Sequence, residues 1–198
     1  MNTGAVKSWN KFKQTAREGF GEGILILGTI AVIESGNSVS TINGINSAEA
    51  GRAAQLLRDA AFARVSLLTV RAFDRITHSD DKHLRCSIEY IRQQGVLGEL
   101  VDGEQQDNLT TAIQMFDKIA ARSSLARLRH QRNKELAHIG EYGEILDRPK
   151  IDELFSLARG TAKIWERLAW GVGLTSTSIE FQTDAYKESA KKFWSPWG

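Results

Sequence analysis

The sequence predicts an all-α fold, a helical bundle of four to five main helices with helical extensions at both ends. Apolar residues recur at three- and four-residue spacing along most of the chain, and the alternation typical of strands never persists. Hydrophobic residues make up 41% of the 198 residues, which is enough for a core. With only two prolines, the composition is neither proline-rich nor that of a disordered chain.

The N-terminal region is expected to form one helix over about residues 7–34, with glycines at positions 19, 21 and 23 allowing a bend. Residues 35–47 are rich in Ser, Asn and Gly and are expected to be a loop, with Ser47 capping the next helix. The most apolar run, residues 24–33, is ten residues long, whereas a membrane span needs about 20. We therefore expect a buried helix here and no membrane partner.

The next helix is expected over about residues 48–76, followed by a break at residues 77–81 whose aspartates cap another short helix. The buried stripe of the helix over residues 48–76 is expected to consist of Leu56, Leu57, Ala60, Ala61, Arg64, Leu67, Leu68 and Arg71. Residues 96–107 read as a surface loop. A long helix is expected over about residues 108–137 and a last major one over 152–170, before a polar helix at 184–193 and an aromatic tail. We divide the chain into an N-terminal extension (1–46), a bundle (47–174) and a C-terminal region (175–198).

Charge and cysteine content narrow the function classes. Lys and Arg number 26 against 24 Asp and Glu, so no global charge indicates a nucleic-acid or membrane partner, and any basic site must be local. The single cysteine, Cys86, excludes an internal disulfide framework and an all-cysteine zinc site. Together with the lack of a signal-peptide pattern, this favours a cytoplasmic protein.

One stretch is locally basic. Between Lys118 and Lys134 there are six Lys or Arg residues and no Asp or Glu. Such a patch can hold phosphates by charge, and arginine can also do so with two hydrogen bonds. The expected RNA-binding side chains of this stretch are Arg127, Arg129, His130 and Lys134.

Two residues near the end of this stretch could carry chemistry. Arg132 can neutralise charge on a phosphorus undergoing substitution, and His138 can move protons near neutral pH. RNA supplies its own nucleophile in the 2′-hydroxyl, so no metal or other cofactor is expected. On an ideal helix the two residues face about 120° apart. Either the helix distorts, or a second copy completes the site; a plain solvated basic helix capped by a histidine is the structural alternative.

The motif Arg-Asn-Lys-x-x-Ala-His over residues 132–138 resembles the Arg-polar-x(3–5)-His signature of HEPN domains, most closely their abortive-infection U branch. The segment LLTVRAFDR, residues 67–75, is similar to that branch's second helix, and residues 152–170 fit the helix after the signature. The resemblance covers about residues 48–170.

This resemblance implies a bundle that usually forms a homodimer around a shared cleft, and a metal-independent endoribonuclease of a toxin–antitoxin or antiphage system. Carried over, Arg132 stabilises phosphate charge, His138 is the general acid–base residue and Asn133 orients the pair. A cognate antitoxin or defence-complex protein is a possible further partner. The tyrosine of the nucleotidyltransferase-paired branch is replaced by Gly140, which argues against control through that residue.

Other features have simpler interpretations. His78, Asp80, Asp81 and His83 could bind a metal, but helix capping explains the aspartates. Cys86 reads as a packed thiol. The tail containing Phe193, Trp194 and Trp197 could stack on RNA bases, dock on a partner or fold back over the core. A non-catalytic HEPN module that binds RNA or nucleotide, and a helical protein whose basic helix binds an acidic partner, remain rival functions.

Overall fold

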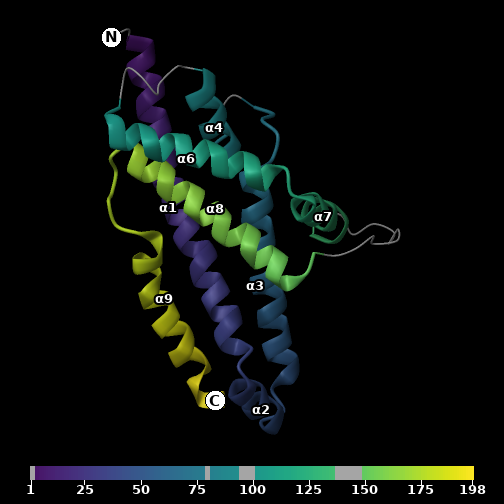
Figure 1. Cartoon of the computed structure of the whole chain (residues 1–198). Coiled ribbons are helices and arrows are strands. Elements are labelled where there is room, and N and C mark those ends of the chain that lie inside the picture. Colours follow the sequence, from purple (N-terminus) through teal and green to yellow (C-terminus); the bar gives the residue numbers. More distant parts are fainter. Residues whose placement is uncertain (1–2, 79–80, 94–100, 137–148) are drawn as a thin grey trace.

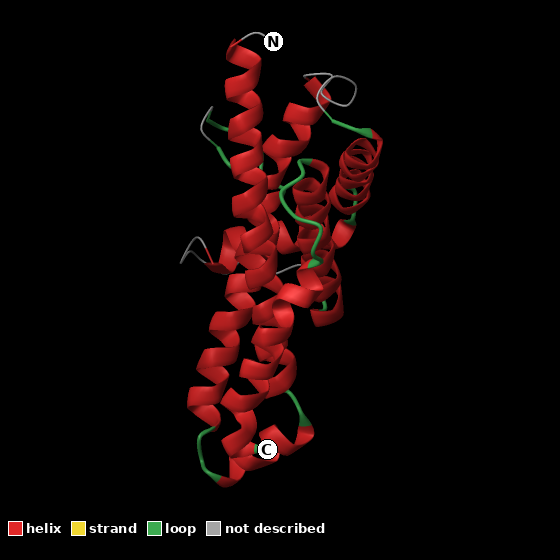
Figure 2. Cartoon of the chain, turned by 90° about the vertical axis from the view of Figure 1, so that its left-hand side faces the viewer, coloured by secondary structure: helices red, strands yellow, loops and turns green. Residues whose placement is uncertain are grey.

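The computed structural model describes residues 3–78, 81–93, 101–136 and 149–198. These residues form eight α-helices and no strand, packed as an elongated bundle (Figures 1 and 2). The predicted all-α fold is confirmed at this level.

The centre of the bundle is the contact between α1 (Thr3–Gly36) and α8 (Ile151–Gly171). α1 continues without a break through the glycines at positions 19, 21 and 23. A side chain at Gly19 would overlap the ring of Trp165, and one at Gly23 would meet Ala162 and Ile179, whereas Gly21 faces open space. Two of the glycines therefore let α1 and α8 approach closely, and they do not bend the helix.

Residues of α1 share one core with the rest of the bundle. Phe12, Ile26 and Ile33 belong to the same buried cluster as Phe116 and Leu157. By length and composition alone, Ser8–Gly36 would also suit a membrane span, a test that core helices of soluble proteins pass as well. The apolar part of α1 is therefore longer than the ten-residue run 24–33, and the expectation that it is too short to span a membrane was wrong on length.

The segment expected to be a loop contains a helix. α2 (Val39–Ser47) begins after Ser38, whose hydroxyl accepts the Thr41 backbone N–H at 3.2 Å. Ser47 is consequently the last residue of α2 and does not cap α3 (Gly51–Ala72). The prediction failed because the N-cap at Ser38 and packing against the C-terminal end outweigh a Ser/Asn/Gly-rich composition.

The predicted buried stripe of α3 is wrong for most of its members, although Ala61 and Leu68 are partly buried and pack against the core. Leu56 is 71% exposed and Leu67 is 43% exposed, while Val65, Thr69 and Val70 are buried. Both faces of α3 carry apolar residues, so their spacing alone did not select the face that packs against α1 and α8.

The predicted long helix over residues 108–137 is divided into α6 (Gly103–Ala120) and α7 (Ser123–Gln131). Arg122 takes an extended conformation between them, ahead of two serines, a residue type that favours helix caps and turns over helix interiors. The break redirects α7 so that Leu125 and Leu128 reach the core. It also sends the basic side chains of this stretch in different directions.

The short helix α4 (Leu84–Gln93) begins later than expected, and Asp81 does not cap it. Instead Asp81 Oδ2 accepts the backbone N–H groups of Thr77 at 2.7 Å and His78 at 3.0 Å, which closes the turn before α4.

The C-terminal helix α9 (Ile179–Trp194) runs beside α1 toward α2, and a 3₁₀ turn, η2 (Ser195–Trp197), meets α2 at that end of the bundle (Figure 1). Trp194 is buried, and its indole N–H donates to the Val32 carbonyl at 3.0 Å. Of the three readings of the aromatic tail, folding back over the core is the one that Trp194 adopts, while Phe193 stays exposed.

Candidate functional site

A polar cavity of about 1070 Å³ lies where the C-terminal end of α3 meets α4, α7 and the π-helical turn η1 (Arg132–Leu136). Six basic and three acidic side chains line it. The basic residues are Arg71, Arg75, Lys82, Arg85, Arg129 and Arg132; the acidic ones are Glu18, Asp74 and Asp81.

Ion pairs balance only part of this positive charge. Arg71 pairs with Glu22 at 2.6 Å and Lys82 pairs with Glu18 at 3.6 Å. Within the described residues, Arg75, Arg85 and Arg129 have no acidic partner at ion-pair distance. The cavity therefore carries an excess of cationic groups suited to an anion.

The end of α3 gathers two of these arginines on one backbone oxygen. The Phe73 carbonyl accepts Arg129 Nη2 at 2.6 Å and Arg85 Nε at 3.2 Å. Phe73 is the C-cap of α3, where carbonyls lack helical partners and the helix dipole is negative. The Arg85 guanidinium also lies over the ring of Phe116, 5.2 Å from its centroid.

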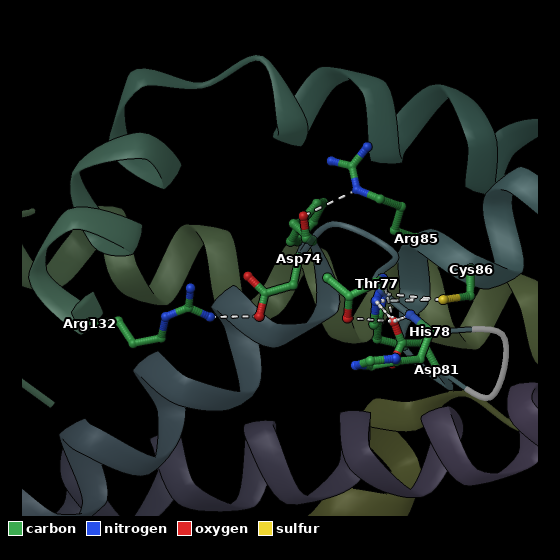
Figure 3. Close-up of polar contacts among 9 residues, drawn as sticks. Asp74, Thr77, His78, Asp81, Arg85, Cys86 and Arg132 are labelled. Atoms are coloured by element: carbon green, nitrogen blue, oxygen red, sulfur yellow. Dashed lines mark hydrogen bonds and ion pairs between the residues drawn. The ribbon is translucent and has the colours of Figure 1, made fainter. Parts of the chain in front are cut away.

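The next residue, Asp74, holds the predicted catalytic arginine. Arg132 Nη1 lies 2.6 Å from Asp74 Oδ2, and Arg132 Nε donates to Asn133 Oδ1 at 3.1 Å. In Figure 3, Arg132 and Arg85 come from different elements and both reach the end of α3. Arg132 is thus directed into the cavity, with Asn133 bonded to it.

The backbone changes its helical geometry at Arg132. The chain leaves α7 after Gln131 and forms the wider π-helical turn Arg132–Leu136. Such turns shift side chains away from the positions of an ideal α-helix and often occur at functional sites. The ideal α-helix on which the 120° separation rested is therefore not kept over Arg132–Leu136.

His138 lies outside the described residues, as do Gly140 and the other residues between 137 and 148. Its role as the acid–base residue stays a prediction.

The four residues predicted to bind RNA are placed differently from one another. Arg129 lines the cavity with Arg132. Arg127 instead reaches α8, where its Nη2 lies 2.5 Å from Glu153 Oε1. His130 and Lys134 are exposed, and neither is among the described residues that line the cavity. An RNA contact of any of these four residues stays a prediction.

Burial shapes the electrostatics of the cavity wall. It lowers the pKa of Arg129 from its ordinary value, and the nearby charge of Arg85 lowers it further, against an opposing effect of Asp74. An arginine remains cationic despite such a shift. Burial likewise lowers the pKa of His83, which lines the same cavity, so its neutral form is favoured.

Sequence reasoning gave no role to Asp74, Arg75 or Arg85. Asp74 and Arg75 lie in the segment that resembles the HEPN second helix, but they were expected inside a helix over residues 48–76, whereas α3 ends at Ala72 and places both residues just beyond its end. Arg85 had no such signal, because only the fold brings it to the Phe73 carbonyl.

The weaker candidates have structural contacts. Asp81 closes the turn at Thr77 and His78, and the Cys86 thiol lies 3.5 Å from His83 Nε2, with its pKa raised by burial. Among the described residues, no group of three or more His, Cys, Asp or Glu is arranged to hold a metal ion.

The described geometry can bind an anion beside Arg132 and neutralise the charge of that anion. No protein-family model, no curated protein and no solved structure matches this chain.

Proposed function

We propose that this protein is a metal-independent endoribonuclease of the HEPN type, acting in the cytoplasm within a prokaryotic toxin–antitoxin or antiphage system. The observation that supports this best is the position of Arg132 in a cavity with excess positive charge. A phosphodiester is the RNA group that such a cavity suits, because arginine binds phosphate through charge and paired hydrogen bonds.

In the proposed reaction the 2′-hydroxyl of RNA attacks the adjacent phosphorus as the bond to the 5′-oxygen breaks. His138 accepts the hydroxyl proton, and the partner's copy of the same residue in a homodimer donates a proton to the leaving 5′-oxygen. The products are a 2′,3′-cyclic phosphate and a 5′-hydroxyl. Arg132 stabilises the added negative charge on the phosphoryl oxygens, and Asn133 orients its guanidinium.

The contact between Arg132 and Asp74 has to be exchanged for a phosphate before Arg132 can act. Both side chains are partly exposed, at 21% and 30%, so water screens the pair and the exchange is inexpensive. Asn133 can keep its bond to Nε while Nη1 changes partner.

The test is incubation of total RNA with the wild type, Arg132→Ala and His138→Ala in EDTA, with products resolved on a denaturing gel. We expect cleavage by the wild type alone, ending in cyclic phosphates. Arg92→Ala is the matched control, because Arg92 is a partly exposed, ion-paired arginine on α4 that does not line the cavity. Equal cleavage by the wild type and both site variants would refute the site.

The held state of Arg132 favours one second candidate, a HEPN module that binds RNA without cutting it and serves as a sensor or scaffold in a defence complex. While Arg132 is paired with Asp74 it is not aligned for cleavage, so this geometry also suits a cavity that binds RNA without cutting it. RNA that shifts in a native gel but stays intact in the cleavage assay would support this candidate.

A further inference from the structure

We propose that Arg85 and Arg129, brought together on the Phe73 carbonyl, form a second phosphate subsite that holds an RNA phosphodiester next to the one at Arg132. This inference rests on the proposed function for its choice of RNA. It assigns a ligand to two residues that the cleavage chemistry does not use.

The first support is the arrangement of like charges. Arg85 comes from α4 and Arg129 from α7, and both guanidinium groups donate to one carbonyl oxygen. Two cations this close repel one another, and a single backbone oxygen carries only a partial negative charge. An anion bound between them would remove that repulsion.

The second support is the number of hydrogen-bond donors left over. Each guanidinium has five N–H donors. Within the described residues, Arg85 gives one through Nε to the Phe73 carbonyl, and its flat face lies on Phe116. Its two terminal nitrogens form no hydrogen bond or ion pair with another described residue. A phosphate oxygen pair is the group that such a fork binds.

The third support is that both side chains are held in place before any ligand arrives. The Phe116 ring supports Arg85 from one side, and Phe116 itself is buried in stacked contact with Phe73. Arg129 is partly buried and fixed by a 2.6 Å hydrogen bond. Side chains ordered in advance lose little entropy on binding, which favours a binding role over a merely solvated surface.

The location favours a neighbouring phosphate of the same strand. Arg85 and Arg129 contact Phe73, while Arg132 contacts Asp74, the next residue in the chain. All three line one cavity of about 1070 Å³, which is large enough for more than one nucleotide unit. The substrate is therefore a single strand that places consecutive phosphates along the end of α3.

The experiment measures binding of a fluorescent twelve-residue oligouridylate at several salt concentrations, in a His138→Ala background that prevents cleavage. Loss of one phosphate contact lowers the slope of log K against log salt by about 0.7 for a single strand. We expect this loss for Arg85→Gln and for Arg129→Gln, with affinity reduced about fivefold or more. Because both arginines hold one phosphate, the double variant should lose no more slope than either single variant.

Arg92→Gln is the matched control, since it removes one positive charge from α4 outside the cavity and should leave the slope unchanged. Arg85→Lys keeps the charge and should keep most of the slope. If Arg129→Gln does not fold, Arg85→Gln and Arg85→Lys carry the test.

The outcomes separate this subsite from the proposed function. If Arg85→Gln and Arg129→Gln bind as Arg92→Gln does while Arg132→Ala abolishes cleavage, the subsite is refuted and the ribonuclease stands. A double variant that loses twice the slope would refute a shared phosphate. If the His138→Ala protein does not bind the oligouridylate at all, both proposals fail.

Discussion

The carboxylate of Asp74 lies 2.6 Å from the guanidinium of Arg132, although 58 residues separate the two in the chain. The residue before Asp74 holds Arg85 and Arg129 on its carbonyl. A dipeptide at the end of α3 thus positions three arginines from three different elements. It supplies one full negative charge against three positive ones, which leaves the cavity with its affinity for anions.

The first prediction concerns the competition between Asp74 and RNA for Arg132. Asp74→Asn removes the charge that holds Arg132, so RNA should bind more tightly. A partly exposed ion pair is worth up to about 1 kcal/mol, which corresponds to about a two- to fivefold lower Kd. The measurement is fluorescence anisotropy with the labelled oligouridylate in the His138→Ala background.

Asp117→Asn is the control for this change. Asp117 forms an ion pair of the same 2.6 Å length with Arg92, but it does not line the cavity. Both variants raise the net charge by one, so equal tightening by the two would trace the effect to overall charge and contradict a specific role of Asp74.

The second prediction is a pH dependence of stability that comes from His83. Burial lowers its pKa in the folded protein below the ordinary value of 6.5, and the charges of Asp81 and Asp74 oppose this only in part. Below pH 6.5 the unfolded chain therefore binds more protons at this position than the folded chain. The free energy of unfolding should fall as the pH drops through this window, by at most about 1.4 kcal/mol per pH unit.

Urea unfolding of the wild type and His83→Gln between pH 7.5 and 5 tests this. The variant should show a shallower decrease than the wild type, whereas His130→Gln, at an exposed position, should keep the wild-type decrease. An unchanged decrease in His83→Gln would show that other groups cause it.

The fold class could be predicted from the sequence because helical spacing of apolar residues is a local signal. The start of α8 at Ile151 and its end at Gly171 follow from the same signal. The face of α3 and the break at Arg122 could not be predicted, since α3 is apolar on both faces and the break depends on where Leu125 and Leu128 find the core. α2 was missed because a single N-cap at Ser38 and packing against η2 outweigh its composition.

For the site, a motif within one short segment indicated Arg132 and its neighbour Asn133, and the charge pattern indicated Arg129. The partners that orient them are distant in sequence. Arg129 reaches a carbonyl 56 residues away, and Asp74 belongs to another helix end. Charge patterning could not separate Arg129 from Arg127, because the break before α7 decides which of the two faces the cavity.

The third prediction concerns the attachment of α9. The Glu166 side chain is fully buried; its Oε2 accepts the N–H of Ile179 at 2.7 Å, and its other oxygen pairs with Lys163. Ile179 is the first residue of α9, so this bond satisfies a donor that no helical carbonyl can reach.

Glu166→Ala leaves that donor buried without a partner, which costs about 1–3 kcal/mol in the free energy of unfolding. Glu188→Ala, which removes an exposed carboxylate on α9 itself, should change it by less than about 0.5 kcal/mol. Similar values for the two variants in urea unfolding would mean that α9 does not depend on Glu166.

The last prediction tests whether α1 is an integral part of the bundle or an extension of it. Gly19 and Gly21 are two positions apart on α1, yet a side chain at position 19 would overlap the Trp165 ring and one at position 21 would meet nothing. Gly19→Ala should therefore force α1 and α8 apart and destabilise the protein by about 1–3 kcal/mol. Gly21→Ala should stabilise it by about 0.5–1 kcal/mol, because alanine favours a helix interior more than glycine does. If α1 folds as one unit with α8, urea unfolding should show a lower free energy of unfolding for Gly19→Ala and a higher one for Gly21→Ala. If α1 were a detachable extension, both alanines would act only through helix propensity and both would stabilise.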